Sequence, residues 1–98
     1  MNGSPLNITH REAPGGGEFT IGRDAIMTYR DLGEGHIMVN HTKVAKQSEG
    51  RGLARLLYRH MVDFARDRNL KVTPTCSYVV AMFERFPEDR DVLADGAG

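Results

Sequence analysis

The sequence predicts one α+β (mixed α/β) domain with the element order β-β-β-β-α-β-α. Three observations predict this class. Short segments in which apolar and polar residues alternate fill much of the first 42 positions, as half-buried strands do. Apolar residues then recur at helical spacing between residues 48 and 68. A short apolar segment and a second helical pattern follow, so the middle of the chain forms a strand-helix-strand unit.

The first four strands are expected at residues 6–11, 18–21, 25–30 and 36–42. The connections between them are short and rich in glycine, so these strands should run antiparallel. In the fourth strand, apolar residues occupy both alternating sets of positions, so this strand should be central and covered on both faces. The alternation puts Ile37, Val39 and His41 on one face and Met38, Asn40 and Thr42 on the other.

A long amphipathic helix should run from Ser48 to about Arg68. Ser48 is a suitable N-cap residue, and Asn69 is a typical stop signal. The apolar face of this helix is formed by Leu53, Leu56, Leu57, Met61, Phe64 and Ala65.

The fifth strand is expected at residues 70–76, and a second helix at residues 77–86, which Pro87 ends. The helical crossover makes the fourth and fifth strands parallel. Pro74 interrupts the fifth strand. Because proline cannot donate to a ladder hydrogen bond, one side of this strand should be unpaired there.

A chain of 98 residues forms one domain with a modest core. We expect residues 1–5 to be disordered, residues 6–92 to form the domain and residues 93–98 to form a flexible tail. The single cysteine cannot make an intrachain disulfide, and no apolar run approaches the roughly 20 residues that cross a bilayer. A cytoplasmic protein without membrane contact, monomeric or homodimeric, is expected.

The charge is balanced overall, with 13 basic and 13 acidic residues, which argues against a general nucleic-acid-binding protein. It is unevenly distributed, because residues 51–71 contain six basic and two acidic residues. This local excess suits a small molecule that carries phosphate. The alternative interpretation is a solvated helix face.

The segment Glu49-Gly50-Arg51-Gly52-Leu53-Ala54 lies between a strand and a helix. Glycines at such a junction let the backbone approach a ligand closely. The first N–H groups of a helix have no partner within the helix, so they form an anion site together with the helix dipole. The alternative is that Gly50 and Gly52 only shape a tight turn. The Gly-Lys-Ser/Thr of a P-loop is absent from the sequence.

The stretch from Val44 to Ala54 resembles the acyl-CoA pyrophosphate loop of the GNAT N-acetyltransferase superfamily, whose usual pattern is Val-x-Pro-x-x-Arg/Gln-Gly-x-Gly-x-Gly/Ala. The element order also resembles the cofactor half of that fold. Residues 7–92 resemble the very short GNAT-like group, in which segments like His41-Thr42 and Thr75-Cys76-Ser77 end the fourth and fifth strands.

The resemblance implies that the backbone of Gly50, Arg51, Gly52, Leu53 and Ala54 binds the pyrophosphate of acetyl-CoA, and that Val44 contacts the pantetheine arm. It also implies that the fourth and fifth strands splay apart to admit the thioester. Pro74 either contributes to this splay by removing a ladder donor or is simply a proline of an edge strand.

Two positions depart from the family pattern. Glu49 stands where Arg or Gln is usual, and an acid beside a pyrophosphate is unfavourable. Phe83 stands where the family usually has the tyrosine that protonates the departing thiolate. The same alignment puts Cys76 near the thioester, as a nucleophile that accepts the acetyl group with His41 as its base. The alternatives are a buried structural cysteine and a structural histidine.

The resulting prediction is an N-acetyltransferase that uses acetyl-CoA and an unidentified amine, carried by a small molecule or a protein. The first alternative is a non-catalytic acyl-CoA-binding module, and the second is a structural interaction domain whose glycine loop binds nothing. The spacing of His10, His36 and His60 matches no metal-ligand motif, so no metal is predicted.

Overall fold

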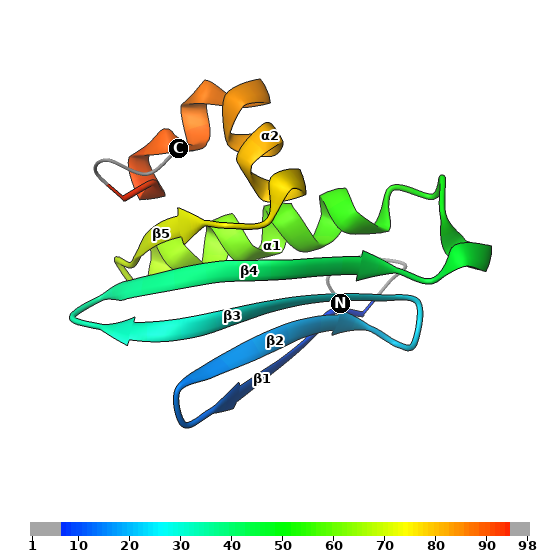
Figure 1. Ribbon diagram of the computed structural model, residues 1–98, viewed down its shortest axis with the longest axis horizontal. Coiled ribbons are helices and arrows are strands. Elements are labelled where there is room, and N and C mark those ends of the chain that lie inside the picture. The colour runs from blue at the N-terminus through cyan, green and yellow to red at the C-terminus, as the bar shows by residue number, and fades with distance from the viewer. Residues whose placement is uncertain (1–6, 95–98) are drawn as a thin grey trace.

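The computed structural model describes residues 7–94, and its elements follow the predicted order. Five strands form one sheet in the order β1-β2-β3-β4-β5 (Figure 1). All neighbouring pairs are antiparallel except β4 and β5, which are parallel as predicted. The strands are β1 (Thr9–Ala13), β2 (Gly16–Ile21), β3 (Ala25–Gly33), β4 (His36–Val44) and β5 (Lys71–Pro74). The helices are α1 (Leu53–Asp67), α2 (Ser77–Arg85) and the 3-10 helices η1 (Lys46–Ser48) and η2 (Pro87–Val92).

One face of the sheet carries the hydrophobic core, and α1 lies along that face (Figure 1). From β2 and β3 the core receives Phe19, Ile21, Ala25, Met27 and Tyr29. From α1 it receives Leu53, Leu57, Tyr58, Met61, Val62 and Ala65. Leu56 was predicted to lie in this set but is 42% exposed, because the buried stripe is centred about one position later along the helix. Asn69, with a φ of 59°, follows the helix as the predicted stop.

The opposite face of the sheet is not covered by any helix in residues 7–94 (Figure 1). Alternation along the strands turns Glu18, Thr20, Ile26, Thr28 and Met38 to this face, where all five are half-buried. The expectation that the fourth strand is covered on both faces was therefore wrong.

A β-bulge at Asn40 changes the alternation of β4. Tyr29 of β3 pairs with Val39, but the preceding residue, Thr28, pairs with His41, so Asn40 is the extra residue. The Thr28 hydroxyl donates to the Asn40 side chain at 2.7 Å. The bulge turns His41 to the uncovered face and Thr42 to the core face. This reverses the predicted positions of these two side chains.

β5 is short and pairs with β4 only as far as Val39 and Pro74. The Lys71 N–H donates to the Gly35 carbonyl just before β4, and the Thr75 N–H donates to the Val39 carbonyl of β4, so by alternation the nitrogen of Pro74 faces the outer edge. Pro74 is therefore a proline of an edge strand, and its missing donor is not what separates the strands. Beyond Val39, residues 40–44 of β4 have no β5 partner.

Asp24 fixes the connection from β4 to α1. The Ser48 hydroxyl donates to the Asp24 carboxylate at 2.7 Å, and the Ala45 N–H donates to the Asp24 carbonyl at 2.7 Å. Ser48 is buried in η1, and the N-cap of α1 is Gly52, so the prediction that Ser48 caps the helix was wrong. Its hydroxyl instead joins the loop to the β2–β3 turn.

The segment after α2 is fixed by a buried carboxylate. Asp89 is 1% exposed and accepts two hydrogen bonds from the Arg59 guanidinium, each of 2.9 Å, and one of 2.8 Å from the Tyr58 hydroxyl. We call these three residues the Asp89 network. Ala94 donates to Val72 on the outer edge of β5, although a flexible tail was expected from residue 93. Residues 1–5, predicted to be disordered, and residues 95–98 of the predicted flexible tail lie outside the described part of the chain. Among residues 7–94, no helix is long and apolar enough to cross a membrane.

Candidate functional site

A cavity of about 250 Å³ lies between the start of α1 and the start of α2. Five of the six residues that the resemblance assigns to the cofactor line it: Val44, Gly50, Gly52, Leu53 and Ala54. Arg51, the sixth, is exposed between the two glycines. Four further residues complete the lining, namely Ser48, Glu49, Arg55 and Tyr78.

The first turn of α1 opens into this cavity without a capping side chain. Gly50 and Gly52 have φ values of 85° and 77°, in the left-handed region that favours glycine. The Leu56 N–H makes a 3.2 Å bond to the Gly52 carbonyl, so the N–H groups of residues 53–55 have no acceptor within the helix. These donors and the positive end of the helix dipole form a site suited to an anion.

The charged and polar side chains at the cavity differ in their effect on anion binding. Arg55 favours an anion, whereas the exposed carboxylate of Glu49 opposes one. Burial raises the pKa of Tyr78, although the charges of Arg55 and Arg85 act to lower it. Tyr78 therefore stays protonated at neutral pH and offers the cavity a hydroxyl donor.

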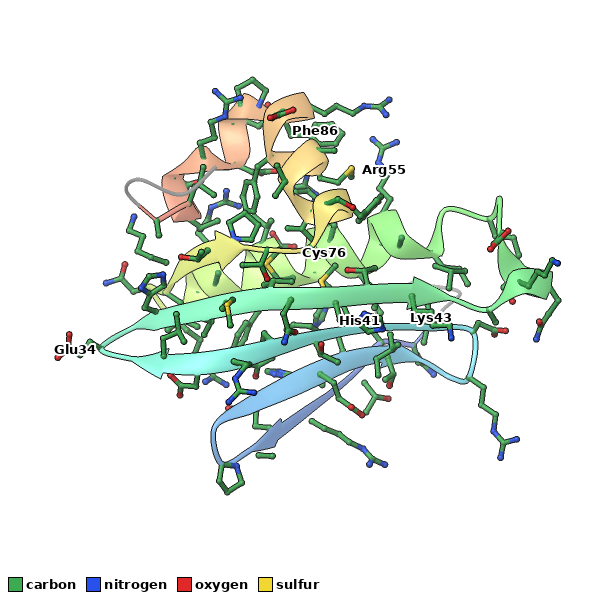
Figure 2. The ribbon with its side chains drawn as sticks, in the orientation of Figure 1. Glu34, His41, Lys43, Arg55, Cys76 and Phe86 are labelled. Atoms are coloured by element: carbon green, nitrogen blue, oxygen red, sulfur yellow. The ribbon has the colours of Figure 1, made fainter. Side chains whose placement is uncertain are left out.

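Cys76 is the N-cap residue of α2 and packs half-buried against the core (Figure 2). Its Sγ lies 3.5 Å from the Thr42 hydroxyl, which the bulge has turned to this face. Burial acts to raise the pKa of the thiol, but hydrogen bonding to Thr42 and to the amides of Tyr78 and Val79 more than offsets it. The net effect is a lowered pKa, and this arrangement favours a thiolate.

The side chain of His41 lies away from Cys76. The bulge leaves its side chain exposed on the uncovered face of the sheet, while Thr42 and Cys76 are on the core face (Figure 2). The hypothesis that His41 is the base for Cys76 is therefore not supported by the geometry. Strand alternation alone put His41 on the wrong face of the sheet, because a bulge leaves no clear signal in a single sequence.

Phe83 is a core residue. It is 2% exposed, and its ring meets Tyr58 edge-on, with the two centroids 5.5 Å apart. This side chain carries no proton for a departing thiolate and does not line the cavity.

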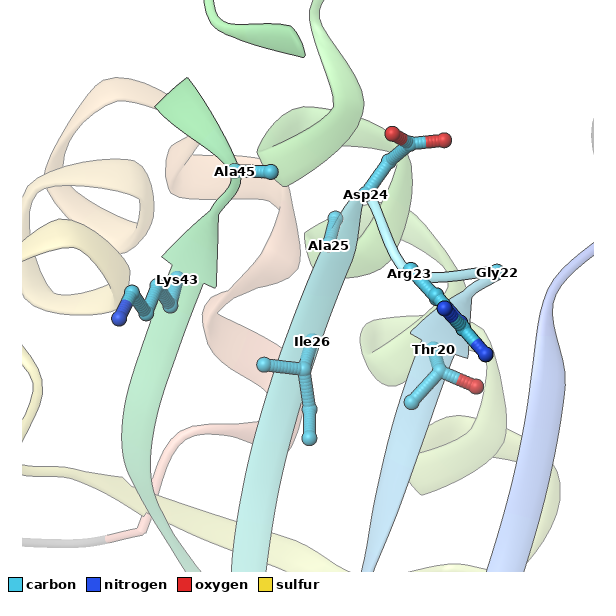
Figure 3. A pocket seen from close by; sticks show the side chains of 8 residues that line it. All are labelled: Thr20, Gly22, Arg23, Asp24, Ala25, Ile26, Lys43 and Ala45. Atoms are coloured by element: carbon cyan, nitrogen blue, oxygen red, sulfur yellow. The ribbon is translucent and has the colours of Figure 1, made fainter. Parts of the chain in front are cut away.

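A second cavity, of about 290 Å³, lies on the uncovered face at the β2–β3 turn (Figure 3). Arg23 and Lys43 bring positive charge to it, and Ile26 and Ala45 supply apolar surface. Asp24 also lines it, but its carboxylate is bonded to Ser48. Within residues 7–94, no cluster of three histidine, cysteine or acidic side chains could hold a metal ion.

Four residues at the site were not singled out as ligand contacts by the sequence. Ser48 and Asp24 join two loops far apart in the chain, and no local pattern encodes that contact. Arg55 lies one turn after Arg51 on the basic helix, so the charge pattern could have indicated it. Tyr78 follows Cys76 by two residues, and no motif in the sequence marks it as a ligand contact.

The mixed sheet with a glycine-rich loop at the start of α1 defines the class, a small GNAT-like α+β domain. A family model described as GCN5-related N-acetyltransferase matches residues 18–92, and the chain belongs to that family of acyltransferases. The family generally uses acetyl-CoA and an amine acceptor.

A solved structure supports this assignment. The chain is 32% identical to a GCN5-like protein from Staphylococcus aureus, an inferred N-acetyltransferase whose solution structure was determined by NMR. The similarity covers 93% of this chain and 90% of the other, with a TM-score of 0.73. No curated protein matches the chain.

Proposed function

We propose that the protein binds acetyl-CoA with its pyrophosphate on the backbone from Gly50 to Ala54 and transfers the acetyl group to an amine. The observation that carries this proposal is the uncapped start of α1 inside a cavity. Val44 lines the same cavity, and it ends the part of β4 that has no β5 partner. Its unpaired edge offers main-chain groups to a pantetheine arm. We place the reaction in the cytoplasm, where a lone thiol stays reduced.

Cys76 takes the acetyl group first in this proposal. Its thiolate attacks the thioester carbonyl, a new carbon–sulfur bond forms, and the bond to the CoA sulfur breaks to release the CoA thiolate. An amine then attacks the acetyl-cysteine, the second carbon–sulfur bond breaks, and the Cys76 thiolate is restored. The nitrogen loses its extra proton to water.

This route accounts for the phenylalanine at position 83. Direct attack by an amine on the thioester releases CoA thiolate while the nitrogen still holds an extra proton, so a general acid and a base assist it. In the first step through Cys76, one thiolate replaces another and no proton has to move. The lowered pKa of Cys76 increases the share of thiolate without a contribution from His41.

The alternative is a non-catalytic acyl-CoA-binding module. The burial of Phe83 favours it, because the usual acid is missing, and so does the position of His41 on the other face of the sheet. The two functions share the cavity and differ only in what happens to the acetyl group.

Two measurements test the proposal. Titration calorimetry with acetyl-CoA should show one saturable site in the micromolar range, about −8 kcal/mol. Denaturing mass spectrometry after incubation with acetyl-CoA should show one added acetyl group. Cys76→Ala should bind acetyl-CoA and lack the adduct.

The outcomes separate the functions. Added amines, tested as a lysine peptide and as small diamines, should remove the adduct and speed the release of CoA. Binding without any adduct or CoA release supports the non-catalytic module. An adduct that persists in Cys76→Ala moves the chemistry to another residue, and absence of binding at millimolar ligand rejects both functions.

A further inference from the structure

The guanidinium groups of three arginines lie over the Phe86 ring: Arg59, which is bonded to Asp89, and Arg55 and Arg85, which come from different helices. The guanidinium carbon of Arg55, on α1, lies 5.2 Å from the centre of the Phe86 ring, and that of Arg85, at the end of α2, lies 5.7 Å from it. Figure 2 shows Arg55 reaching from α1 towards Phe86. The ring is therefore in contact with two guanidinium groups besides that of Arg59.

Neither arginine is neutralised by the described chain. Within residues 7–94, Arg59, Arg66 and Arg68 each lie within 4.0 Å of a carboxylate, but no such ion pair includes Arg55 or Arg85. A cation–π contact at an exposed site contributes only about 0.5–1 kcal/mol. Two neighbouring guanidinium groups without a counter-charge are suited to an anion that carries more than one negative charge.

The arginine pair is continuous with the loop site. Arg55 lines the cavity together with Gly50, Gly52 and Tyr78. Tyr78 lines the cavity too; burial raises the pKa of its phenol, and the charges of Arg55 and Arg85 act in the opposite direction. Arg55 and Tyr78 thus line the same cavity as the first turn of α1, and Arg85 shares the Phe86 ring with Arg55.

Backbone amides and guanidinium groups suit different anions. Backbone amides suit a pyrophosphate diester, whose oxygens are spread along a chain. A phosphomonoester carries about −1.5 to −2 charges at neutral pH. Its terminal oxygens can accept two parallel hydrogen bonds from one arginine guanidinium. We infer that Arg55 and Arg85, with the Tyr78 hydroxyl, bind a ribose phosphomonoester of the ligand, so that the site selects CoA over its 3′-dephospho form. This inference rests on the proposed function.

The test compares CoA with 3′-dephospho-CoA by titration calorimetry at pH 7.5 and low salt. Wild-type protein should bind CoA at least about tenfold more tightly, as charge-assisted hydrogen bonds allow. In Arg55→Gln/Arg85→Gln the preference should fall below about threefold, mainly through weaker CoA binding. Arg30→Gln is the matched control, because Arg30 is also exposed but lies on β3, away from the cavity. It should keep the wild-type preference.

A change of pH gives a second readout on the wild-type protein. The second ionisation of a phosphomonoester has a pKa near 6, so the preference for CoA should shrink between pH 7.5 and pH 5. This readout and the wild-type comparison of the two ligands hold even if the double variant does not fold, which circular dichroism would reveal.

Each outcome decides one point. Equal affinity of the wild-type protein for both ligands overturns the inference and leaves the proposed function intact. A preference for CoA that survives in the double variant also overturns the inference, because groups other than the two arginines then bind the phosphate. Failure of the wild-type protein to bind either ligand rejects the proposed function itself.

Discussion

Gly52 allows the structural need for a glycine to be separated from the functional need. Its φ of 77° lies in the left-handed region, yet a Cβ built at this position meets no protein atom within 4 Å. Packing therefore does not require glycine here. Two reasons remain, the backbone conformation and the close approach of a ligand to the loop, and different substitutions test them.

Gly52→Ala should lower the free energy of unfolding by about 1–2 kcal/mol, the cost of a Cβ in the left-handed region. For a domain of this size, this is a fall in Tm of roughly 5–15 °C. Gly52→Asn should lose clearly less, because asparagine tolerates that conformation. Gly33→Ala is the matched control. Gly33, in the β3–β4 hairpin, has a φ of 86° and similar open space, so it carries the same strain away from the site.

Acetyl-CoA binding then gives the functional result. Both Gly52 variants should bind at least about tenfold more weakly, because a side chain stands where the pyrophosphate approaches the backbone. Gly33→Ala should bind as the wild-type protein does. Thermal unfolding by circular dichroism and titration calorimetry measure the two effects. A Gly52→Asn protein with wild-type affinity would refute the close-approach argument, and one as unstable as Gly52→Ala would refute the argument from conformation.

Three further predictions concern single contacts. Asp89→Asn should cost about 2–3 kcal/mol by breaking the Asp89 network. Burial acts to raise the pKa of Asp89, but the hydrogen bonds that it accepts lower it overall. This stabilisation is therefore present above the unfolded pKa of about 3.9 and is lost as the pH falls through the folded pKa, so melting curves should depend less on pH below about 4 in the variant. Ser48→Ala should cost about 1–2 kcal/mol in denaturant unfolding, because it removes a buried hydrogen bond to Asp24; an unchanged midpoint would contradict this. Thr42→Val should raise the pH midpoint of Cys76 alkylation by iodoacetamide, and Thr42→Ser should restore it, whereas identical midpoints in all three proteins would show that Thr42 does not act on the thiol.

Local patterns were enough to predict most of the fold. Alternation in β2 and β3 brings Phe19 and Met27 to the core, and both are fully buried. The glycine-rich loop fell between β4 and α1, where the positions of Gly50 and Gly52 indicated a ligand site. These features depend on residues within a few positions of one another, so they can be recognised in a single sequence.

The contacts that complete the site join distant parts of the chain. Asp24 and Ser48 are 24 residues apart, and Thr42 and Cys76 are 34 apart. Residue type alone made Ser48 a helix cap, because serine is a common N-cap. Its actual partner depends on how the β2–β3 turn lies against the loop, which only the folded sheet determines.

The end of the β4–β5 ladder and the bulge at Asn40 together determine which side chains lie beside Cys76. The last ladder contact, from the Thr75 N–H to the Val39 carbonyl at 3.0 Å, comes directly before the bulge. The bulge then turns Thr42 towards Cys76 and His41 away from it. The same irregularity therefore favours the thiolate and removes the expected base. In the proposed route, the exchange of one thiolate for another needs only the first of these. The later attack of the amine on acetyl-Cys76 still leaves an extra proton on nitrogen, so the geometry fits the first of the two steps best.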